Sequence, residues 1–449
     1  MPFEINNEFI ENLESLIENR EDQVIIDLFA EEHTADIAEI IDELSNDDAT
    51  YLFRLLDSEK TAEALLDIDE DDRARILSKL SEKEIAEHID ELDTDDAADL
   101  MGSLSNERQN IVLSNIEDDD HAKDIAELLQ YDEDTAGGLM AKELVKVNEN
   151  WTVPNCVRKM RSQAQEVTRV HSIYVVDNKN VLKGRLSLKD LLVAPASATI
   201  SEISIPKVDY VNVNDKAEEV ARIMQKYDLE AIPVVDGENH LLGRITIDDI
   251  VDVIKEEAEK DYQMAAGLTD DVEADDSIFD LTKARLPWLV LGLFGGTAAA
   301  SIMGGFDEAL KNFPELFFFT PLIAAMAGNV GVQSSAIIVQ GLAKDNLRGS
   351  LLNRMFKEIS LALVNGIFLA AIVFSLGLLL KYPIRVCTTI SISLVIVIII
   401  ASLVGTFVPL ILHKKGIDPA VATGPFITTC NDIFGIFIFF SIAKLILGF

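Results

Sequence analysis

Residues 421–447 read VATGPFITTCNDIFGIFIFFSIAKLIL, an apolar stretch long enough to cross a bilayer as a helix. A single carboxylate, Asp432, lies well inside it. A charged side chain in the middle of a membrane helix costs about 3 kcal/mol even on lenient insertion scales. Lys444, the one basic residue of the stretch, is too far along the helix to pair with Asp432. We therefore expect Asp432 to face protein or water and to have a function.

Four more apolar stretches of similar length precede this one. Their approximate limits are Leu286–Gly305, Leu316–Leu342, Ile359–Leu380 and Val386–Leu412, and Val421–Leu447 is the fifth. The connections between them are short and carry most of the charged residues of this half. The pattern predicts a multi-domain α-helical membrane protein with five transmembrane helices in a lipid bilayer.

Basic residues predict the orientation of these spans. If the N-terminal half is cytoplasmic, the inner side carries Lys283, Arg285, Lys344, Arg348, Arg354, Lys357, Lys414 and Lys415. The outer side then carries Lys311, Lys381, Arg385 and Lys444. Because basic residues concentrate on the cytoplasmic side, we expect a multi-pass protein of the cell (inner) membrane with its C-terminus outside.

The second and fifth spans contain polar and helix-breaking residues that a lipid-facing helix would avoid. They are Gly328, Asn329 and Gln333 in the second span, and Pro425, Thr428 and Asn431 in the fifth. Such residues either line a watery pore beside Asp432 or pack helices together through small side chains and hydrogen bonds. Carboxylate, amide and hydroxyl oxygens suit hard divalent cations such as Mg²⁺.

The first 280 residues have a very different composition. They contain 70 acidic and 26 basic residues, whereas the remainder contains 7 acidic and 12 basic ones. A nucleic-acid partner is excluded, because binding to phosphates needs clustered Lys and Arg. So much negative charge repels itself in a compact fold unless cations neutralise it.

An internal repeat with a step of 24 residues occupies the first part of this acidic half. Its copies read AEIIDELSNDDA (38–49), AEALLDIDEDDR (62–73) and AEHIDELDTDDA (86–97). Each copy predicts a short helix, an acidic turn and another helix, and stacked pairs of this kind form an α-solenoid. The aspartate pairs recur in register as Asp47/Asp48, Asp71/Asp72 and Asp95/Asp96. They either cap helices or form a ridge that binds cations.

A second duplication follows, with an offset of 59 residues. SIYVVDNKNVLKGRLSLKDLL (172–192) aligns with AIPVVDGENHLLGRITIDDIV (231–251), and each copy predicts a strand, a turn, a strand and a helix. The pattern resembles tandem CBS domains, which are α/β modules, some of which bind adenosine nucleotides. That resemblance assigns Ser187, Asp190, Thr246 and Asp249 to a nucleotide site, with ATP as the candidate. The alternative is that Asp190 and Asp249 merely cap the starts of the helices that carry them.

The order of these parts is similar to that of a known family. Together with PLIAAMAGNVGVQSS (321–335) and GIDPAVATGPFITTCNDIFG (416–435), it resembles the MgtE family of bacterial magnesium channels. The resemblance implies a homodimer that takes up Mg²⁺ and is not an enzyme. The domains expected from it are an acidic helical N domain (1–130), two CBS domains (131–195 and 196–255), a connecting plug helix (256–284) and a five-helix pore domain (285–449).

The resemblance also implies where Mg²⁺ binds. Asp432 falls on the family's pore aspartate, and carboxylates of the cytoplasmic part sense internal Mg²⁺ and close the pore. By position, these sensor carboxylates are Asp95, Asp96 and Asp99 in the solenoid, Asp248 and Asp252 after the second CBS motif, and Glu257 and Asp261 on the plug helix.

Two other functional classes fit the same residues. A secondary transporter could carry a proton on Asp432 and couple it to divalent cation movement. Alternatively, the spans could anchor a nucleotide sensor that acts on a partner. The sequence contains no P-loop, which argues against an ATP-driven pump.

Overall fold

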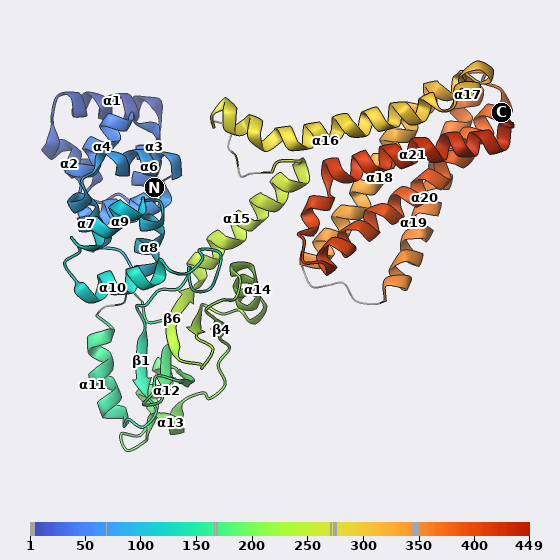
Figure 1. Cartoon of the computed structure of the whole chain (residues 1–449). Helices are drawn as coiled ribbons and strands as arrows, with labels where there is room; N and C mark the ends of the chain where they lie inside the picture. Colours follow the sequence, from blue (N-terminus) through green and yellow to red (C-terminus); the bar gives the residue numbers. More distant parts are fainter. Residues whose placement is uncertain are drawn as a thin grey trace. The chain divides into compact units, whose positions relative to one another are not determined.

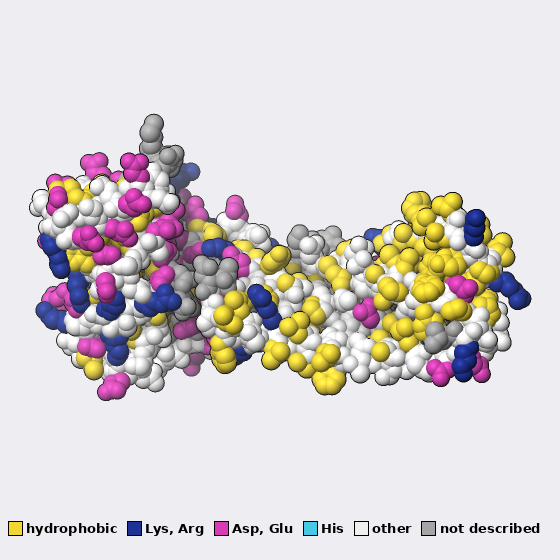
Figure 2. Space-filling view, turned by 90° about the horizontal axis from the view of Figure 1, so that it is seen from above, with side chains coloured by type: hydrophobic (Ala, Val, Ile, Leu, Met, Phe, Trp, Pro, Cys, Tyr) yellow, Lys and Arg dark blue, Asp and Glu magenta, His cyan; other side chains and the backbone are white. Residues whose placement is uncertain are grey.

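The computed structural model describes residues 5–68, 70–165, 167, 169–269, 272, 276–343 and 350–449. Lys344 and Arg348, two of the residues used to predict orientation, lie outside this range, as does the side chain of Asp71. The chain divides into two compact units, Met1–Lys255 and Glu256–Phe449. On the face shown in Figure 2, acidic side chains gather over the first unit and apolar ones over the second.

Short stacked helices form the first part of the first unit (Figure 1). They are α1 (Asn7–Glu18), α2 (Asp22–Phe29), α3 (Thr34–Glu43), α4 (Asn46–Leu55), α5 (Ser58–Asp67), α6 (Glu70–Lys79), α7 (Glu82–Ile89), α8 (Thr94–Gly102), α9 (Asn106–Leu113) and α10 (Asp119–Leu128). Ile37, Phe53 and Leu65 are among the apolar residues fully buried between them. This arrangement confirms the predicted helical solenoid.

The 24-residue step of the sequence is also the step of the helices. Helices α4, α6 and α8 begin at Asn46, Glu70 and Thr94, one repeat apart. Side-chain caps fix the start of α4, where the Ser45 hydroxyl accepts the Asp48 N–H, and the start of α7, where Ser81 forms a capping box with Glu84. The repeated acidic pairs lie in first turns, where negative charge complements the helix dipole.

The second part of the first unit contains two copies of one small α/β motif. Its elements are β1 (Val145–Asn148), α11 (Val153–Gln163), β2 (Ile173–Val176), β3 (Leu182–Leu186), α12 (Leu188–Val193), α13 (Ile200–Ile203), β4 (Val211–Asn212), α14 (Ala217–Tyr227), β5 (Ala231–Val235) and β6 (Leu241–Thr246). In each copy the middle strand pairs in parallel with the strand before it and antiparallel with the strand after it.

A glycine occupies the same place in both copies because another backbone passes close by. A Cβ atom on Gly184 would lie 2.5 Å from the carbonyl oxygen of Ile205. A Cβ atom on Gly243 would lie 2.6 Å from the carbonyl oxygen of Ala141. The glycines that mark the predicted duplication are therefore required by packing, since real Cβ contacts are never so short.

Helix α15 (Ile247–Ala266) begins in the first unit and ends in the second. The second unit continues with α16 (Ile278–Gly304), α17 (Asp307–Asn312), α18 (Glu315–Ala343), α19 (Leu351–Leu379), α20 (Ile384–Lys414), the 3-10 helix η1 (Pro419–Ala422) and α21 (Gly424–Leu447). Helices α16, α18, α19, α20 and α21 are long and apolar enough to cross a membrane. These five candidate spans match the five predicted stretches.

The membrane helices extend beyond the apolar stretches that predicted them. Helix α19 begins at Leu351, eight residues before the predicted span, and therefore contains Glu358. The charges of Arg354 and Lys357 instead predict a connection between spans in this segment. Large apolar side chains such as Phe294 and Phe368 are exposed on the outside of the unit, as expected of a surface that faces lipid or a partner.

Candidate metal and pore sites

Carboxylates meet at the start of α8, where the solenoid contacts the CBS motifs within the first unit. Ligand oxygens of Asp93, Asp95 and Glu143 all lie within 4.8 Å of one another. The Thr94 hydroxyl donates to Oε2 of Glu143 at 2.8 Å, and the Thr94 N–H donates to the same oxygen at 3.2 Å. Glu143 is thus held in place by the N-terminus of the helix that carries Asp95.

The end of the second CBS motif supplies further charges to this place. Asp249 accepts hydrogen bonds from the Thr246 hydroxyl at 2.7 Å and from the Thr246 N–H at 2.9 Å. The buried Arg244 guanidinium lies 3.7 Å from Oδ2 of Asp93. We call Asp93, Asp95, Asp96, Glu143 and Asp249 the acidic cluster. In the part of the chain that the structure describes, Arg244 is the cation seen to pair with it.

Electrostatics show how unfavourable this crowding of negative charge is. Burial raises the pKa of Asp96 to about 7, and the charges of Asp249 and Asp93 add to the rise. Burial and the neighbouring charge of Asp96 raise the pKa of Asp95 well above its usual range. Burial likewise raises the pKa values of Asp93 and Asp249. The cluster is relieved either by protons or by a cation.

The donor set fits a hard divalent cation. Mg²⁺ prefers oxygen ligands, keeps several of its waters, and is commonly held by one or two carboxylates. Asp93, Asp95 and Glu143 offer oxygens close enough to share one ion or its water shell. A divalent ion would neutralise charges that Arg244 alone leaves uncompensated.

The remaining predicted sensor residues have different positions. The charges of Asp99 and Asp248, both exposed, contribute to the raised pKa of Asp96 and so lie beside the cluster. Asp252 lies instead near Asp67 of the solenoid. Burial is the main cause of the raised pKa of Asp67, and the negative charge of Asp252 is the second. Glu257 and Asp261 belong to the second unit, where Lys260 lies 3.4 Å from Glu257.

Sequence reasoning missed Asp93 and Glu143. Asp93 precedes α8 as its N-cap residue, one position before the helical turn that carries the predicted aspartates. Glu143 lies 49 positions beyond Thr94 and outside both duplications. The N-cap position could have indicated Asp93, whereas no sequence signal relates Glu143 to the start of α8.

The acidic cluster makes the stability of the soluble unit depend on pH in a defined direction. Because the pKa of Asp96 is raised to about 7, the folded unit binds more protons than the unfolded chain between about pH 4 and 7. Stability therefore falls as pH rises through this window when no divalent cation is present. One unit of pKa difference is worth about 1.4 kcal/mol, or about 3–5 °C in a domain of this size.

We therefore expect the Tm of residues 1–255 in a chelator to be at least about 3 °C lower at pH 8 than at pH 5. The Asp95→Asn/Asp96→Asn variant should lose most of this difference, because it keeps the shape of the side chains and removes their titration. Thermal unfolding followed by circular dichroism measures both proteins. An identical pH dependence in the two would contradict this account of the cluster.

In the membrane unit, α18 and α21 pack together where Asp432 lies. A Cβ atom on Gly328 of α18 would be 3.1 Å from Cγ2 of Thr428 and 3.8 Å from Oδ1 of Asp432. A Cβ atom on Gly331 would overlap the side-chain amide of Asn431. The two motifs quoted from the second and fifth spans are therefore in contact, and the glycines of one admit the polar side chains of the other.

Asn431 is the most buried polar residue of this contact. Its side chain is 1% exposed, and neither amide atom has a hydrogen-bond partner among the described residues. Asp432 beside it is partly buried, while Asn329 and Gln333 are exposed on α18. Buried amides in proteins are nearly always satisfied by protein or water, so this place suits water or a hydrated ion.

The N-terminal end of α21 is held against the end of α15. Gly424 has a positive φ of 52°, and a Cβ atom there would lie 2.1 Å from the carbonyl oxygen of Ala265. Gly267, with a φ of 87°, is covered in the same way by the Pro425 ring. Glycine is needed at both positions, because the φ angles are positive and because another part of the chain passes too close for a Cβ atom. A movement of the end of α15 would therefore displace the start of α21, the helix that carries Asp432.

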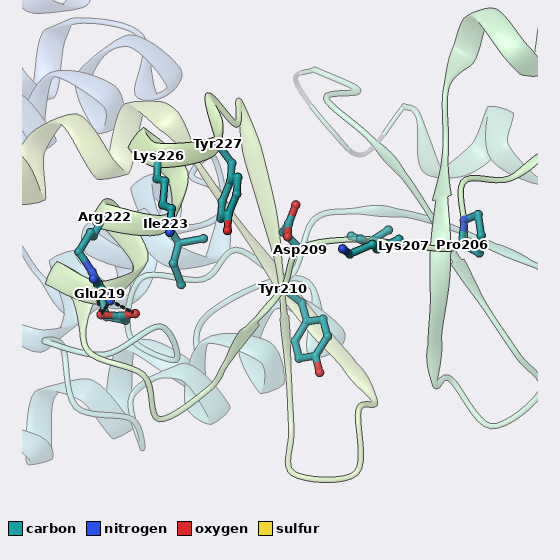
Figure 3. A pocket seen from close by; sticks show the side chains of 10 residues that line it. Pro206, Lys207, Asp209, Tyr210, Glu219, Arg222, Ile223, Lys226 and Tyr227 are labelled. Carbon is teal, nitrogen blue, oxygen red and sulfur yellow. Dashed lines mark hydrogen bonds and ion pairs between the residues drawn. The ribbon is translucent and has the colours of Figure 1, made fainter. Parts of the chain in front are cut away.

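The CBS motifs also contain two hollows. One, of about 630 Å³, is lined by Lys207, Tyr210, Arg222, Lys226 and Tyr227, among others (Figure 3). The other, of about 370 Å³, is lined by His171, Arg185 and Ser187, among others. Basic and aromatic side chains suit phosphate groups and a stacked base.

Three of the four residues predicted for nucleotide binding make hydrogen bonds close to the starts of helices. Thr246 donates to Asp249, as the capping alternative predicts, and Asp249 takes part in the acidic cluster. Ser187 accepts the Lys189 N–H at 3.2 Å, which is also a cap, although Ser187 lines the second hollow as well. Asp190 is partly buried in the first turn of α12.

Comparison with known families gives matches in both compact units. A family model described as a divalent cation transporter matches residues 320–442. A model of the intracellular N domain of the same family matches residues 32–134, and CBS-domain models match residues 136–197 and 200–256.

Relatives of known name are similar over most of their length. The magnesium transporter MgtE of Thermus thermophilus is 37% identical over 327 residues, which are 72% of each chain. That of Bacillus subtilis is 35% identical over 317 residues, which are 70% of each chain. The crystal structure of the cytosolic domain of the Mg²⁺ channel MgtE in complex with ATP matches 54% of this chain and 99% of its own, with 35% identity and a TM-score of 0.51.

Proposed function

Since the chain belongs to the MgtE family of divalent cation transporters, which are not enzymes, we propose that it carries Mg²⁺ across the cell membrane through a pore containing Asp432. The observation that carries this proposal is the contact of Gly328 with Thr428 and Asp432. It brings a lone membrane carboxylate to a helix seam lined by small and polar residues. Mg²⁺ gives up its waters reluctantly, so one carboxylate per chain can select the hydrated ion.

We assign the soluble residues to the cytoplasm, the C-terminus to the outside, and the working form to a homodimer. The basic residues near the inner ends of the spans support the orientation. The exposed apolar side chains of the membrane unit allow a second copy to pack against it. Two copies of Asp432 around a shared axis would place two carboxylates on one divalent ion.

We propose further that internal Mg²⁺ closes the pore by binding to the acidic part of the chain. The raised pKa values in the acidic cluster support this, because burial and neighbouring carboxylates disfavour negative charges that a divalent cation would neutralise. A cation that binds the compact arrangement better than the open one shifts the population toward the compact one. The contact of Ala265 and Gly267 with Gly424 and Pro425 gives α15 direct access to the pore helix.

The domain limits follow the same assignment: an N domain at 1–130, CBS domains at 131–195 and 196–255, a plug segment at 256–284 and a pore domain at 285–449.

We also propose that the CBS pair binds ATP. The hollows lined by Lys207, Arg222 and Lys226 and by Arg185 and Ser187 support it. So does the ATP complex of the related cytosolic domain.

Mg²⁺ influx into liposomes tests the transport proposal and separates a channel from a coupled transporter. The full chain should admit Mg²⁺ down its concentration gradient with no pH gradient, as reported by a dye enclosed in the vesicles. Collapsing an imposed pH gradient should leave the rate within about twofold, because Asp432 is proposed to bind the ion rather than to carry a proton. Protein-free liposomes are the control, and influx that requires a pH gradient would contradict the channel.

A further inference from the structure

A second carboxylate, Glu358, lies partly buried among the membrane helices. The Ser334 hydroxyl of α18 donates to Oε1 of Glu358 at 2.6 Å, and the Ser402 hydroxyl of α20 donates to the same oxygen at 2.7 Å. The two hydroxyl oxygens lie 3.2 Å apart. Both serines are buried, with 6% and 2% of their surface exposed, so three helices meet at one acceptor atom.

This arrangement holds the three helices more firmly than apolar packing would. Two hydroxyl donors on one acceptor oxygen give the contact a direction that apolar packing lacks. Buried hydroxyls that lose their acceptor keep the full cost of desolvation. Glu358 therefore fixes both the spacing and the rotation of α18 relative to α20.

The serine contact continues into a glycine contact along the same seam. Ser334 follows Gly331 by about one turn of α18, and Ser402 precedes Gly405 by about one turn of α20. A Cβ atom on Gly405 would lie 2.3 Å from the carbonyl oxygen of Gly331, so the backbones touch there. Any change in the serine contact would change this backbone approach, because helices move as rigid elements.

Gly331 connects this seam to the pore helix. The Asn431 amide occupies the space that a side chain on Gly331 would need. One turn earlier on α18, Gly328 lies beside Oδ1 of Asp432. The path from Glu358 to the pore carboxylate thus consists of two hydroxyls, one backbone contact and one buried amide.

We infer that Glu358 is a positioning residue for ion passage: by accepting both serine hydroxyls, it sets the distance between α18 and the Asp432 carboxylate. The inference rests on the proposed transport function. It needs an acceptor at Oε1 and does not need a negative charge there, since both groups that contact this oxygen are hydroxyl donors. A cation or proton carried by Glu358 itself would need the charge.

Four variants of the full chain separate these possibilities. Glu358→Gln keeps a carbonyl acceptor and removes the charge, whereas Glu358→Leu removes both. Ser334→Ala/Ser402→Ala removes the donors and leaves the carboxylate. Ser360→Ala is the matched control, because the exposed Ser360 hydroxyl on α19 bonds to the Phe356 carbonyl of its own helix at 2.8 Å.

Mg²⁺ influx into liposomes is measured against external Mg²⁺ for each variant, per amount of correctly folded protein. We expect Glu358→Leu and the double serine variant to raise the half-saturating Mg²⁺ concentration by about tenfold or more, as loss of residues that orient metal ligands does. Glu358→Gln and Ser360→Ala should stay within about twofold of the wild type. A purely stabilising role would lower the Tm and leave the half-saturating concentration unchanged.

Three results would overturn the inference. They are an unchanged half-saturating concentration in Glu358→Leu, an unchanged one in the double serine variant, and a Glu358→Gln protein as impaired as Glu358→Leu. The last result would assign the function to the charge of Glu358. Failure of the transport proposal is distinct, because the wild-type chain would then admit no Mg²⁺ in the same assay.

Discussion

Replacing Asp432 by Asn should reduce Mg²⁺ influx by at least about 100-fold while the protein still folds. The amide has nearly the same shape, so packing against Gly328 is kept and the charge alone is lost. Two unit charges 4 Å apart attract by about 4 kcal/mol at the effective dielectric of a protein surface, and each 1.4 kcal/mol is a tenfold change in binding. A dimer would lose two charges at once.

The measurement is the initial rate of dye-reported Mg²⁺ influx into liposomes with equal amounts of protein. Asp307→Asn is the matched control, because Asp307 is an exposed carboxylate in the first turn of α17. It should leave the rate within about twofold, since exposed charges interact weakly with distant groups. An Asp432→Asn protein that keeps half of the wild-type rate would show that Mg²⁺ influx does not depend on this carboxylate.

Neutralising the acidic cluster should make the pore insensitive to internal Mg²⁺. We expect Asp95→Asn/Asp96→Asn to raise the half-inhibiting Mg²⁺ concentration by at least about tenfold, because it removes metal ligands. The same variant should raise the Tm of residues 1–255 in a chelator, since it removes two carboxyl groups whose charged forms are disfavoured by burial and by neighbouring carboxylates. Loss of inhibition together with higher stability separates a binding defect from a folding defect.

The internal repeat provides the control for this variant. Asp47 and Asp48 occupy the same positions two repeats earlier, and there Asp47 pairs with Lys79 at 2.6 Å and is 93% exposed. Asp47→Asn/Asp48→Asn changes the same residue types by the same chemistry outside the cluster. It should leave the half-inhibiting concentration within about twofold. Equal loss of inhibition in both variants would contradict a localised sensor.

Much of the fold follows from local patterns in the sequence. The 24-residue step reappears as the spacing of the starts of α4, α6 and α8, because each repeat buries its own apolar face. The 59-residue offset reappears as two sheets with the same strand order. The five apolar stretches reappear as five long helices, since only hydrogen-bonded helices or closed barrels satisfy the backbone in lipid.

The meeting of distant residues could not be predicted in the same way. Asp96 and Asp249 were each singled out, but the charge interaction between them depends on how the solenoid docks onto the CBS motifs. Glu358 was missed because Arg354 and Lys357 made its segment resemble a loop, and because its partners are 24 and 44 positions away. Docking of this kind is determined by tertiary packing, which local periodicity does not encode.

The most direct test of the account is the Mg²⁺ current through the wild-type chain in excised membrane patches whose soluble-domain side is exposed to increasing Mg²⁺. With Mg²⁺ on the other side and no pH gradient, we predict a current at low Mg²⁺ that declines as Mg²⁺ on the soluble-domain side reaches the millimolar range. A current that stays constant as Mg²⁺ rises on the soluble-domain side, or that appears only with a pH gradient, would contradict a Mg²⁺-gated pore.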